Sequence, residues 1–446
     1  MKKVNLKTII QSQAEENEPN KLLSIYKEVR EVIVSEPAYG ELLSSSIRGN
    51  QEADNALRGI ISEIIEEKGY SVSGESKQEL LDYLCYNIYG LGPAQPYMFD
   101  PDVSEIMVNG FGINEPIRYE KKGYKYVSDD YYLDEQQLLN AITRMLFPLG
   151  DTVNEGKASA ESTLPDGSRL TVAIPPICLN GPSFTIRRFT DLVLMPEEYI
   201  KLGSGTQEMF DFLRLVTEGR SNILVCGGTS TGKTTLLRAL CSYIPKTERV
   251  ITIEDTEELQ LKKYDPQRDV LSFLAQRGRL NFSIRDCLIL ALRERPDRIV
   301  VGEVRGAEAV DLLDSMRTGH EAMGTLHVST PVEAIERLGR EIRAVDPSID
   351  AEILYDEIAR TVDIIIQLKF YKHKGQRVIV SISEPIKYDK GLIYREIFKY
   401  TPEGFTFNQT LSRRLSEKLL ENGATQLLNT PWISEEITEK ERQLYL

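Results

Sequence analysis

Tryptophan and histidine are scarce in this 446-residue sequence, which has one Trp and three His, and its five cysteines are scattered without a CxxC pair. An odd, scattered set of cysteines argues against a disulfide framework, and the lack of paired ligands argues against a structural zinc site. No run approaches the roughly 18 apolar residues that a membrane-spanning helix needs. The first ten residues, MKKVNLKTII, have a basic start but no apolar h-region, so we expect no signal peptide. These absences predict a reduced, cytoplasmic protein that does not insert into a bilayer.

The chain also lacks an excess of positive charge, since it has 54 basic and 68 acidic residues and a net charge of −14. An acidic field repels nucleic acid and anionic lipid, so the composition argues against a general binder of either. Hydrophobic residues make up 41% of the chain and charged residues 27%, which are globular proportions. The length predicts about three domains.

The hydrophobic pattern changes along the chain and predicts where those parts lie. Residues 1–75 show helical spacing, with Gly69 as a plausible helix end, and 76–190 mix helical patterns with short strand-like runs, as in an α+β domain. Residues 191–205 are predicted to form a linker or hinge. In 206–446, Val- and Ile-rich runs alternate with helices, which predicts an α/β domain with a parallel sheet covered on both faces, closed by C-terminal hairpins and helices.

The strongest motif is a phosphate-binding loop between the apolar run NILVC and the helical pattern TTLLRALCSYI. It satisfies G-x-x-x-x-G-K-[ST], and with the next residue it gives the predicted nucleotide-binding set Gly227, Gly228, Thr229, Ser230, Thr231, Gly232, Lys233, Thr234 and Thr235. Glycines let backbone N–H groups surround phosphate oxygens, and the helix N-terminus adds partial positive charge. Lys233 can bridge the terminal phosphates and the Thr234 hydroxyl can ligate Mg²⁺. The motif therefore predicts binding of a nucleoside triphosphate.

Acidic residues follow two other strand-like runs. Glu254 and Asp255 come after the run VITI, and Glu303 comes after the run IVVG. Strand carboxyl ends face the ligand crevice in a doubly wound sheet, so we expect these carboxylates near the loop, where one would hold the metal and another would position water. Acids in solvated turns are the alternative.

Two histidines lie in the segment MRTGHEAMGTLHVST. On a helix, His320 and His327 would fall near one face, so a metal pair is one alternative and an ordinary structural histidine is another. Gly319 and Gly324 interrupt the segment and no third ligand is near, which favours a loop that makes polar contacts around the nucleotide.

Arginines form a further cluster of candidates: Arg169, Arg187, Arg188, Arg293, Arg295 and Arg298. Any one of them is ordinarily a surface residue. A phosphate-transfer site nevertheless needs positive charge against the γ-phosphate, so some of them are candidates to supply it.

Four segments together resemble the Walker A, Asp box, Walker B and His box of the secretion-superfamily ATPases, in that family's order. They are GGTSTGKTTLL, ITIEDTEELQL, LRERPDRIVVGEVRGAEAVDLL and TGHEAMGTLHVSTP. Upstream, GLGPAQPYMFDPDVSEIMVNG and LPDGSRLTVAIPP resemble the N-terminal domain of the CpaF-type ATPases of tight-adherence (Flp) pili. The lack of CxxC pairs favours this branch over the pilus-extension and type II members, which often carry a four-cysteine zinc module.

The resemblance implies a RecA-like P-loop domain, preceded by a smaller α+β domain and a helical N-terminal segment. It implies that Lys233 and Thr234 hold phosphate and Mg²⁺. It further implies that Glu254 polarises the attacking water and that Glu303 is the Walker B carboxylate, which serves the metal.

The same resemblance makes His327, with His320 as a second candidate, a sensor of the γ-phosphate. It makes Arg169 and Arg187 the arginines that approach the nucleotide when the two domains close. The chain departs from the pattern at Thr163, where many CpaF-type relatives have an arginine.

We therefore expect an ATP-hydrolysing, Mg²⁺-dependent motor, organised as a homo-hexamer, for tight-adherence or type IV-like pilus assembly or for type II/IV secretion. It would work at the cytoplasmic face of the membrane through an inner-membrane platform protein. A type IV motor for effectors or conjugation is an alternative. A scaffold that binds ATP with little hydrolysis is another, which the two glutamates weigh against. The net charge weighs against a RecA-type nucleic-acid motor.

Overall fold

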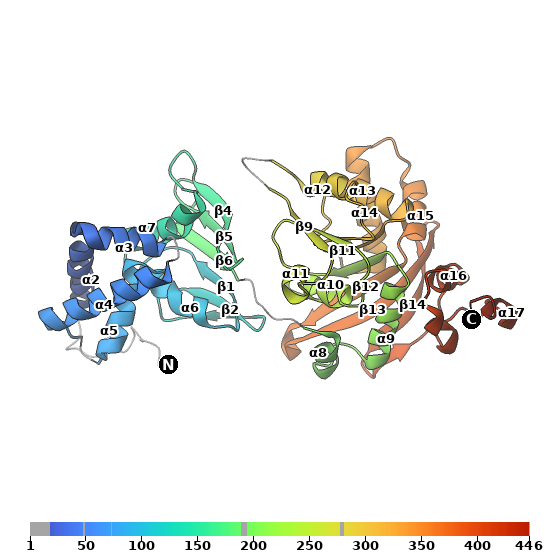
Figure 1. Cartoon of the computed structure of the whole chain (residues 1–446), viewed down its shortest axis with the longest axis horizontal. Helices are drawn as coiled ribbons and strands as arrows, with labels where there is room; N and C mark the ends of the chain where they lie inside the picture. The colour runs from blue at the N-terminus through green and yellow to red at the C-terminus, as the bar shows by residue number, and fades with distance from the viewer. Residues whose placement is uncertain (1–17, 48–49, 73, 189–193, 277–280, 446) are drawn as a thin grey trace. The chain divides into compact units, whose positions relative to one another are not determined.

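A computed structural model describes residues 18–47, 50–72, 74–188, 194–276 and 281–445. The chain divides into two compact units, Met1–Asp191 and Leu192–Leu446 (Figure 1). Each unit has its own buried apolar clusters. Within the described residues, no helix combines the length and the apolar character that crossing a bilayer would take.

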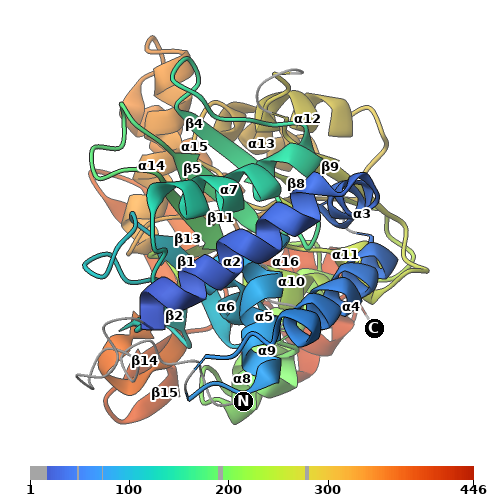
Figure 2. The same cartoon turned by 90° about the vertical axis from the view of Figure 1, so that its left-hand side faces the viewer.

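Four helices begin the described part of the first unit, and they pack on one another (Figure 2): α2 (Glu18–Ser35), α3 (Pro37–Ile47), α4 (Gln51–Lys68) and α5 (Lys77–Ile88). Helix α4 begins where the Asn50 side chain accepts hydrogen bonds from the N–H groups of Glu52 and Ala53. It ends at Gly69, whose φ of +64° is the left-handed conformation that glycine adopts readily. The predicted helix end at Gly69 is therefore confirmed.

Helix α5 belongs with these helices, although the boundary predicted at residues 75 and 76 assigned it to the α+β part. Its Leu80, Leu84 and Ile88 are buried in the same cluster as Leu57 and Ile61 of α4. The change from helical to strand-like patterns indicated the boundary, but that change comes after α5, since the first strand of the unit is Val103–Val108.

The rest of the first unit consists of two helices and a six-stranded antiparallel sheet, whose strands lie in the order β3-β2-β1-β6-β5-β4. Its elements are α6 (Gln95–Phe99), β1 (Val103–Val108), β2 (Arg118–Lys121), β3 (Tyr124–Val127), α7 (Glu135–Leu146), β4 (Ser159–Thr163), β5 (Arg169–Ala173) and β6 (Ser183–Arg187). Alternate strand residues such as Ile106, Val172 and Ile186 pack with Leu138 and Ile142 of α7 in one cluster. Because side chains alternate along a strand, the other face of the sheet carries the intervening, mostly polar residues.

The second unit is built on a nine-stranded sheet in the order β15-β14-β13-β12-β7-β11-β10-β8-β9. Its strands are β7 (Ile223–Gly227), β8 (Val250–Glu254), β9 (Val270–Leu274), β10 (Arg298–Val301), β11 (Glu321–Leu326), β12 (Ile364–Tyr371), β13 (Gln376–Tyr388), β14 (Leu392–Thr401) and β15 (Gly404–Phe407). The six strands from β12 to β9 in that order run parallel, and β13 to β15 are antiparallel additions at the β12 side. The predicted α/β fold with a parallel sheet is confirmed.

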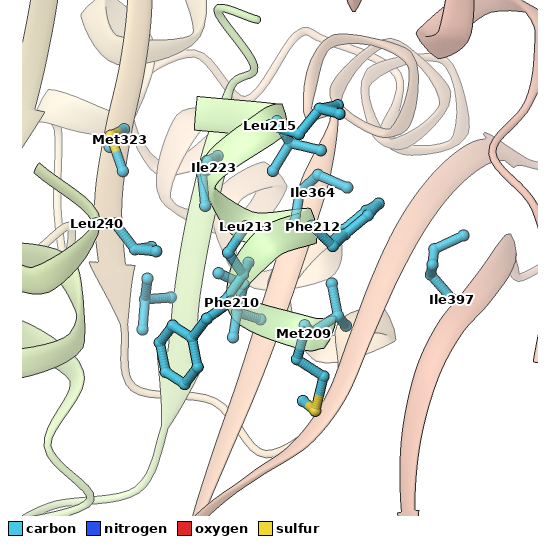
Figure 3. Packing of buried hydrophobic residues seen from close by; sticks show 14 of the residues in the cluster. Met209, Phe210, Phe212, Leu213, Leu215, Ile223, Leu240, Met323, Ile364 and Ile397 are labelled. Atoms are coloured by element: carbon cyan, nitrogen blue, oxygen red, sulfur yellow. The ribbon is translucent and has the colours of Figure 1, made fainter. Parts of the chain in front are cut away.

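Helices bury both faces of this sheet. They are α8 (Pro196–Lys201), α9 (Gln207–Glu218), α10 (Lys233–Cys241), α11 (Leu261–Tyr264), α12 (Ile284–Ala291), α13 (Glu308–Arg317), α14 (Pro331–Val345), α15 (Ala351–Thr361) and α16 (Arg413–Glu421). A last short helix, α17 (Glu439–Arg442), has no buried residues. Along β7, Ile223 belongs to one cluster with Phe212 of α9 and Leu240 of α10 (Figure 3). Val225 belongs to the same cluster, which also includes residues of α16, whereas Leu224 and Cys226 belong to the cluster formed with α12 to α15. This alternation explains why β7 is buried and has no polar side chain at any position.

The predicted linker at 191–205 contains a helix. Pro196 occupies the first turn of α8, where its missing N–H is not needed, and Glu197 and Glu198 favour the helix N-terminus. Tyr199 of α8 is buried in the core of the second unit. Residues 191–193 of the predicted linker lie outside the described residues, and for them the hinge stays a prediction.

Replacing Phe212 by alanine should lower the free energy of unfolding by about 3–5 kcal/mol, because a fully buried aromatic side chain would leave a cavity. Its ring centroid lies 5.4 Å from those of both Phe398 and Trp432. Urea unfolding measures the change. The control Ile353→Ala, at a side chain that is 70% exposed, should change stability by less than about 0.5 kcal/mol. Equal losses in the two variants would contradict this account of the core.

Candidate functional site

The predicted phosphate loop connects the end of β7 to the start of α10. A Cβ at Gly227 would lie 2.6 Å from the Thr231 hydroxyl and 2.9 Å from the Leu368 carbonyl, so only glycine fits there. Gly232, at φ +89°, and Ser230, at φ +59°, both adopt the left-handed conformation. Thr231 closes the loop internally, because its hydroxyl donates to the Gly228 carbonyl at 2.9 Å. The loop therefore has a defined, compact conformation that its glycines permit.

Lys233 extends from the first turn of α10 back into this loop. Its side chain is buried, and Nζ donates to the Gly228 carbonyl at 3.0 Å and lies 3.4 Å from Nδ1 of His327. An ammonium group only donates, so Nδ1 accepts, and the neutral imidazole then carries its proton on Nε2. That Nε2 lies 3.3 Å from Oε1 of Glu303. Lys233, His327 and Glu303 thus form a continuous polar chain.

Glu254 is the most enclosed acidic group at this edge of the sheet, with 3% of its surface exposed. It accepts hydrogen bonds from the N–H groups of Glu258 and Leu259 at 3.0 and 3.1 Å. It also packs against the backbone of Gly302, where an added Cβ would lie 2.9 Å from the Glu254 Cγ. Burial raises its pKa to about 8, an effect that the two backbone hydrogen bonds only partly offset. Near neutral pH this carboxyl can therefore take or release a proton.

Arg305 is a site residue that the sequence argument did not identify. Its guanidinium forms an ion pair with Asp255 and lies 3.8 Å from the Glu303 carboxylate. The arginine thereby joins the acids that follow β8 and β10, so the polar chain extends from Lys233 as far as Asp255. Its position two residues after Glu303, in GEVRG, is the sequence signal that could have indicated it.

The two histidines of the predicted His segment are separated by β11, so they do not share a helical face, which agrees with the interruption that Gly319 and Gly324 indicate. His327 follows the carboxyl end of β11, beside the loop, because Leu326 pairs with Cys226 of the parallel strand β7. His320 precedes the amino end, where its Nδ1 lies 3.3 Å from the Thr318 hydroxyl. At about 3.3 Å per residue, a six-residue strand holds them roughly 20 Å apart. The assignment of His320 to the nucleotide-binding set is therefore wrong, and so is the pairing of the two as metal ligands.

Arg298 of the arginine cluster also lies at the far end of the sheet. It is fully buried at the start of β10, and its Nε donates to Glu248 at 2.5 Å. Such a pair has a structural function, since an unpaired buried charge is strongly destabilising.

The two other predicted arginines belong to the first unit. Arg169 on β5 and Arg187 on β6 are direct cross-strand partners, so their side chains project from the same face of the sheet. The guanidinium of Arg187 lies 3.9 Å from the Glu105 carboxylate. The carboxylate of Glu105 on β1 therefore balances part of the positive charge on this face.

Magnesium has suitable oxygen donors at the loop, in the Thr234 hydroxyl and the Glu303 carboxylate. Mg²⁺ usually takes one or two protein oxygens and completes its shell with water and substrate phosphates. Among the described residues no group of three or more His, Cys, Asp or Glu is arranged to hold a metal alone. The donor set therefore fits a cation that arrives with a phosphate ligand.

The comparisons with known proteins agree on one family. The family model described as "Type II/IV secretion system protein" matches residues 103–380. The chain is 30% identical over 341 residues to "Uncharacterized protein MJ0900" of Methanocaldococcus jannaschii, a match that covers 74% of this chain and 59% of that protein. It is 32% identical over 216 residues to "Conjugal transfer protein TrbB" of Rhizobium radiobacter, covering 48% of this chain and 63% of that one. The chain therefore spans less than two thirds of the length of either relative. Among solved structures, the ATPase DotB of Yersinia pseudotuberculosis is 15% identical with a TM-score of 0.49, and the match covers 75% of this chain and 82% of that one.

Replacing Glu254 by glutamine should change how stability depends on pH. The carboxyl has an ordinary pKa of 4.5 and a folded pKa of about 8, so between these values the folded protein keeps a proton that the unfolded chain has released. Stability of the wild type should therefore fall as pH rises through that window, by at most about 1.4 kcal/mol per pH unit.

The Glu254→Gln variant should lose this slope, so its stability relative to wild type should grow from pH 5 to pH 8 and then level off. Chemical denaturation at several pH values measures it. The exposed control Glu435→Gln should keep the wild-type slope. Parallel curves for wild type and Glu254→Gln would show that this carboxyl titrates normally.

Proposed function

Because this chain belongs to the type II/IV secretion system protein family, we propose that it is a Mg²⁺-dependent ATPase that drives a secretion or pilus machine. The observation that carries this proposal is the polar contact series Lys233–His327–Glu303, which joins the phosphate loop to the acidic residue that follows β10. The ammonium, imidazole and carboxylate groups in this series are all of types that contact a γ-phosphate or its metal ion.

Lys233 is proposed to exchange its contacts with the Gly228 carbonyl and His327 for oxygens of the β- and γ-phosphates. His327 then exchanges the Lys233 donor at Nδ1 for a contact that depends on the γ-phosphate, which makes it the proposed sensor of that group. Mg²⁺, when bound by Thr234 and Glu303, would neutralise charge on the phosphates. Gly227 to Thr235 would surround the remaining phosphate oxygens.

Glu254 is proposed to accept the proton of the attacking water. A general base is most effective when its pKa lies near the working pH, and burial places this pKa at about 8. Arg169 and Arg187 are proposed to add positive charge against the γ-phosphate as it is transferred.

At a finer level, we propose a CpaF-type motor for tight-adherence pilus assembly. It would act as a homo-hexamer at the cytoplasmic face of the membrane through an inner-membrane platform protein. The sequence upstream of the loop and the lack of CxxC pairs support this branch. Neighbouring genes for pilin, prepilin peptidase and a platform protein would support it further.

A conjugation or effector type IV motor is the second candidate, and the similarity to TrbB, a conjugal transfer protein, favours it. Neighbouring genes for DNA processing or mating-channel proteins, with none for a prepilin peptidase, would select this candidate instead.

Changing Lys233 to alanine should abolish ATP turnover, because the γ-phosphate loses its main cationic contact. Phosphate release measures turnover, and thermal unfolding checks that the variant remains folded. Chelating Mg²⁺ should abolish the wild-type activity in the same assay. The control Lys246→Ala, at a side chain that is 77% exposed, should keep the wild-type rate. A folded Lys233→Ala protein that hydrolyses ATP at the wild-type rate would refute the proposed function.

Changing Arg187 to glutamine should lower kcat by roughly 10³-fold or more, the range reported for arginine fingers, while leaving the affinity for Mg·ADP within a small factor. The reason is that this charge would act on the transferred γ-phosphate, which ADP lacks. Arg118→Gln is the matched control, since Arg118 lies on the same sheet. Equal kcat values in the two variants would remove Arg187 from the catalytic set.

A further inference from the structure

The start of β13 contacts the phosphate loop, although it lies well beyond the motifs in sequence. The Nε of Arg377 donates to the carbonyl of Ser230 at 2.9 Å, and the guanidinium lies 4.7 Å from the centroid of the Phe370 ring. A Cβ at Gly232 would lie 3.5 Å from Cδ of Arg377, so the side chain packs closely against the loop. Arg377 therefore contacts two residues of the predicted nucleotide-binding set.

The contact with Ser230 falls at a strained position. Ser230 has a φ of +59°, and a non-glycine residue keeps a left-handed conformation only where its surroundings fix it. The hydrogen bond to Arg377 also keeps the Ser230 carbonyl from turning toward phosphate oxygens, which would repel it. The arginine thus stabilises the one loop residue whose conformation is most costly.

The preceding residue, Gln376, contacts a different segment. Its Nε2 donates to the carbonyls of Gly203 and Leu202 at 3.0 and 3.3 Å. Three residues after Gln376, the N–H of Ile379 donates to the carbonyl of Ser204 at 2.9 Å. The turn between α8 and α9 is therefore held by β13. This turn lies close to the start of the second unit, which begins at Leu192.

Helix α8 itself is within the electrostatic range of Arg377. Burial raises the pKa of the Tyr199 phenol, and the positive charges of Arg238 and Arg377 oppose that rise. The loop, the first residues of β13 and the end of α8 thus form one contiguous group.

We propose that Arg377 is a positioning residue of the phosphate loop, and that Gln376 couples occupancy of the loop to residues 202–204. The two side chains belong to consecutive residues of one strand, so a shift of the loop that moves Arg377 also moves the backbone that carries Gln376. The inference rests on the proposed nucleotide site and adds a route from that site to the segment that follows the boundary between the units.

Hydrogen exchange of the full chain with and without Mg·ADP tests the coupling. In wild type, Mg·ADP should slow exchange both in the loop and in 199–205, because both become part of one stabilised group. In Gln376→Ala, the affinity for Mg·ADP and the loop protection should remain, while the effect on 199–205 should disappear. The control Gln409→Ala, an exposed glutamine of the same unit, should behave as wild type.

Arg377→Gln tests the positioning role and should raise the Kd for Mg·ADP by about tenfold, the size expected for losing one charged hydrogen bond. Arg377→Lys should recover little of this, since lysine lacks the Nε donor and the planar fork. Thermal unfolding shows whether each variant is folded.

Three outcomes would overturn all or part of the inference, and they can be told apart. If wild type does not bind Mg·ADP, the proposed function fails and the coupling fails with it. If wild type binds and Gln376→Ala keeps the full effect on 199–205, the coupling alone is wrong. A wild-type Kd in folded Arg377→Gln would likewise overturn the positioning role alone.

Discussion

The hydrogen bonding of β7 between β11 and β12 is the constraint on which the candidate site depends. All three strands run in the same direction, so the phosphate loop, His327 and the end of β12 meet at one edge of the sheet. The next pairings, β11 with β10 and β10 with β8, bring Glu303 and Glu254 to that edge as well. A shift of one residue in any pairing would exchange the buried faces of a strand and move its terminal acid. The two apolar clusters that cover the sheet therefore also fix the geometry of the polar groups.

The polar groups at this edge are largely satisfied by one another. Lys233 contacts His327, which contacts Glu303, and Arg305 links that acid to Asp255. A nucleotide has to replace some of these contacts rather than fill a vacant set of charges. Binding would then release His327 and Glu303 from their present partners, so the arrangement around the loop would depend on what the loop holds.

Much of the fold follows from the sequence, because the local signals agree with the tertiary structure. The alternation of apolar strands with helices gave the parallel sheet, and the glycine pattern of the loop matches close backbone contacts at Gly227. His320 is a candidate only through the resemblance of its segment to the His box, and that resemblance does not show that β11 begins at Glu321 and separates the two histidines. The linker prediction overlooked α8, because a six-residue helix is too short to show the hydrophobic periodicity by which helices are recognised. Arg377 had no sequence signal, because its contact with Ser230 joins residues 147 positions apart.

The close contact of Gly302 with Glu254 also restricts how this sequence can vary. A methyl group at 302 would overlap Cγ of Glu254, so a change at either position alters what the other can be. Alanine at 302 would require a shorter acid or a displaced β8 end, and both would move the carboxylate away from its two backbone N–H donors. A residue larger than glycine at 302 should therefore be accepted only together with a change at Glu254, although Gly302 follows β10 and Glu254 ends β8, 48 residues away.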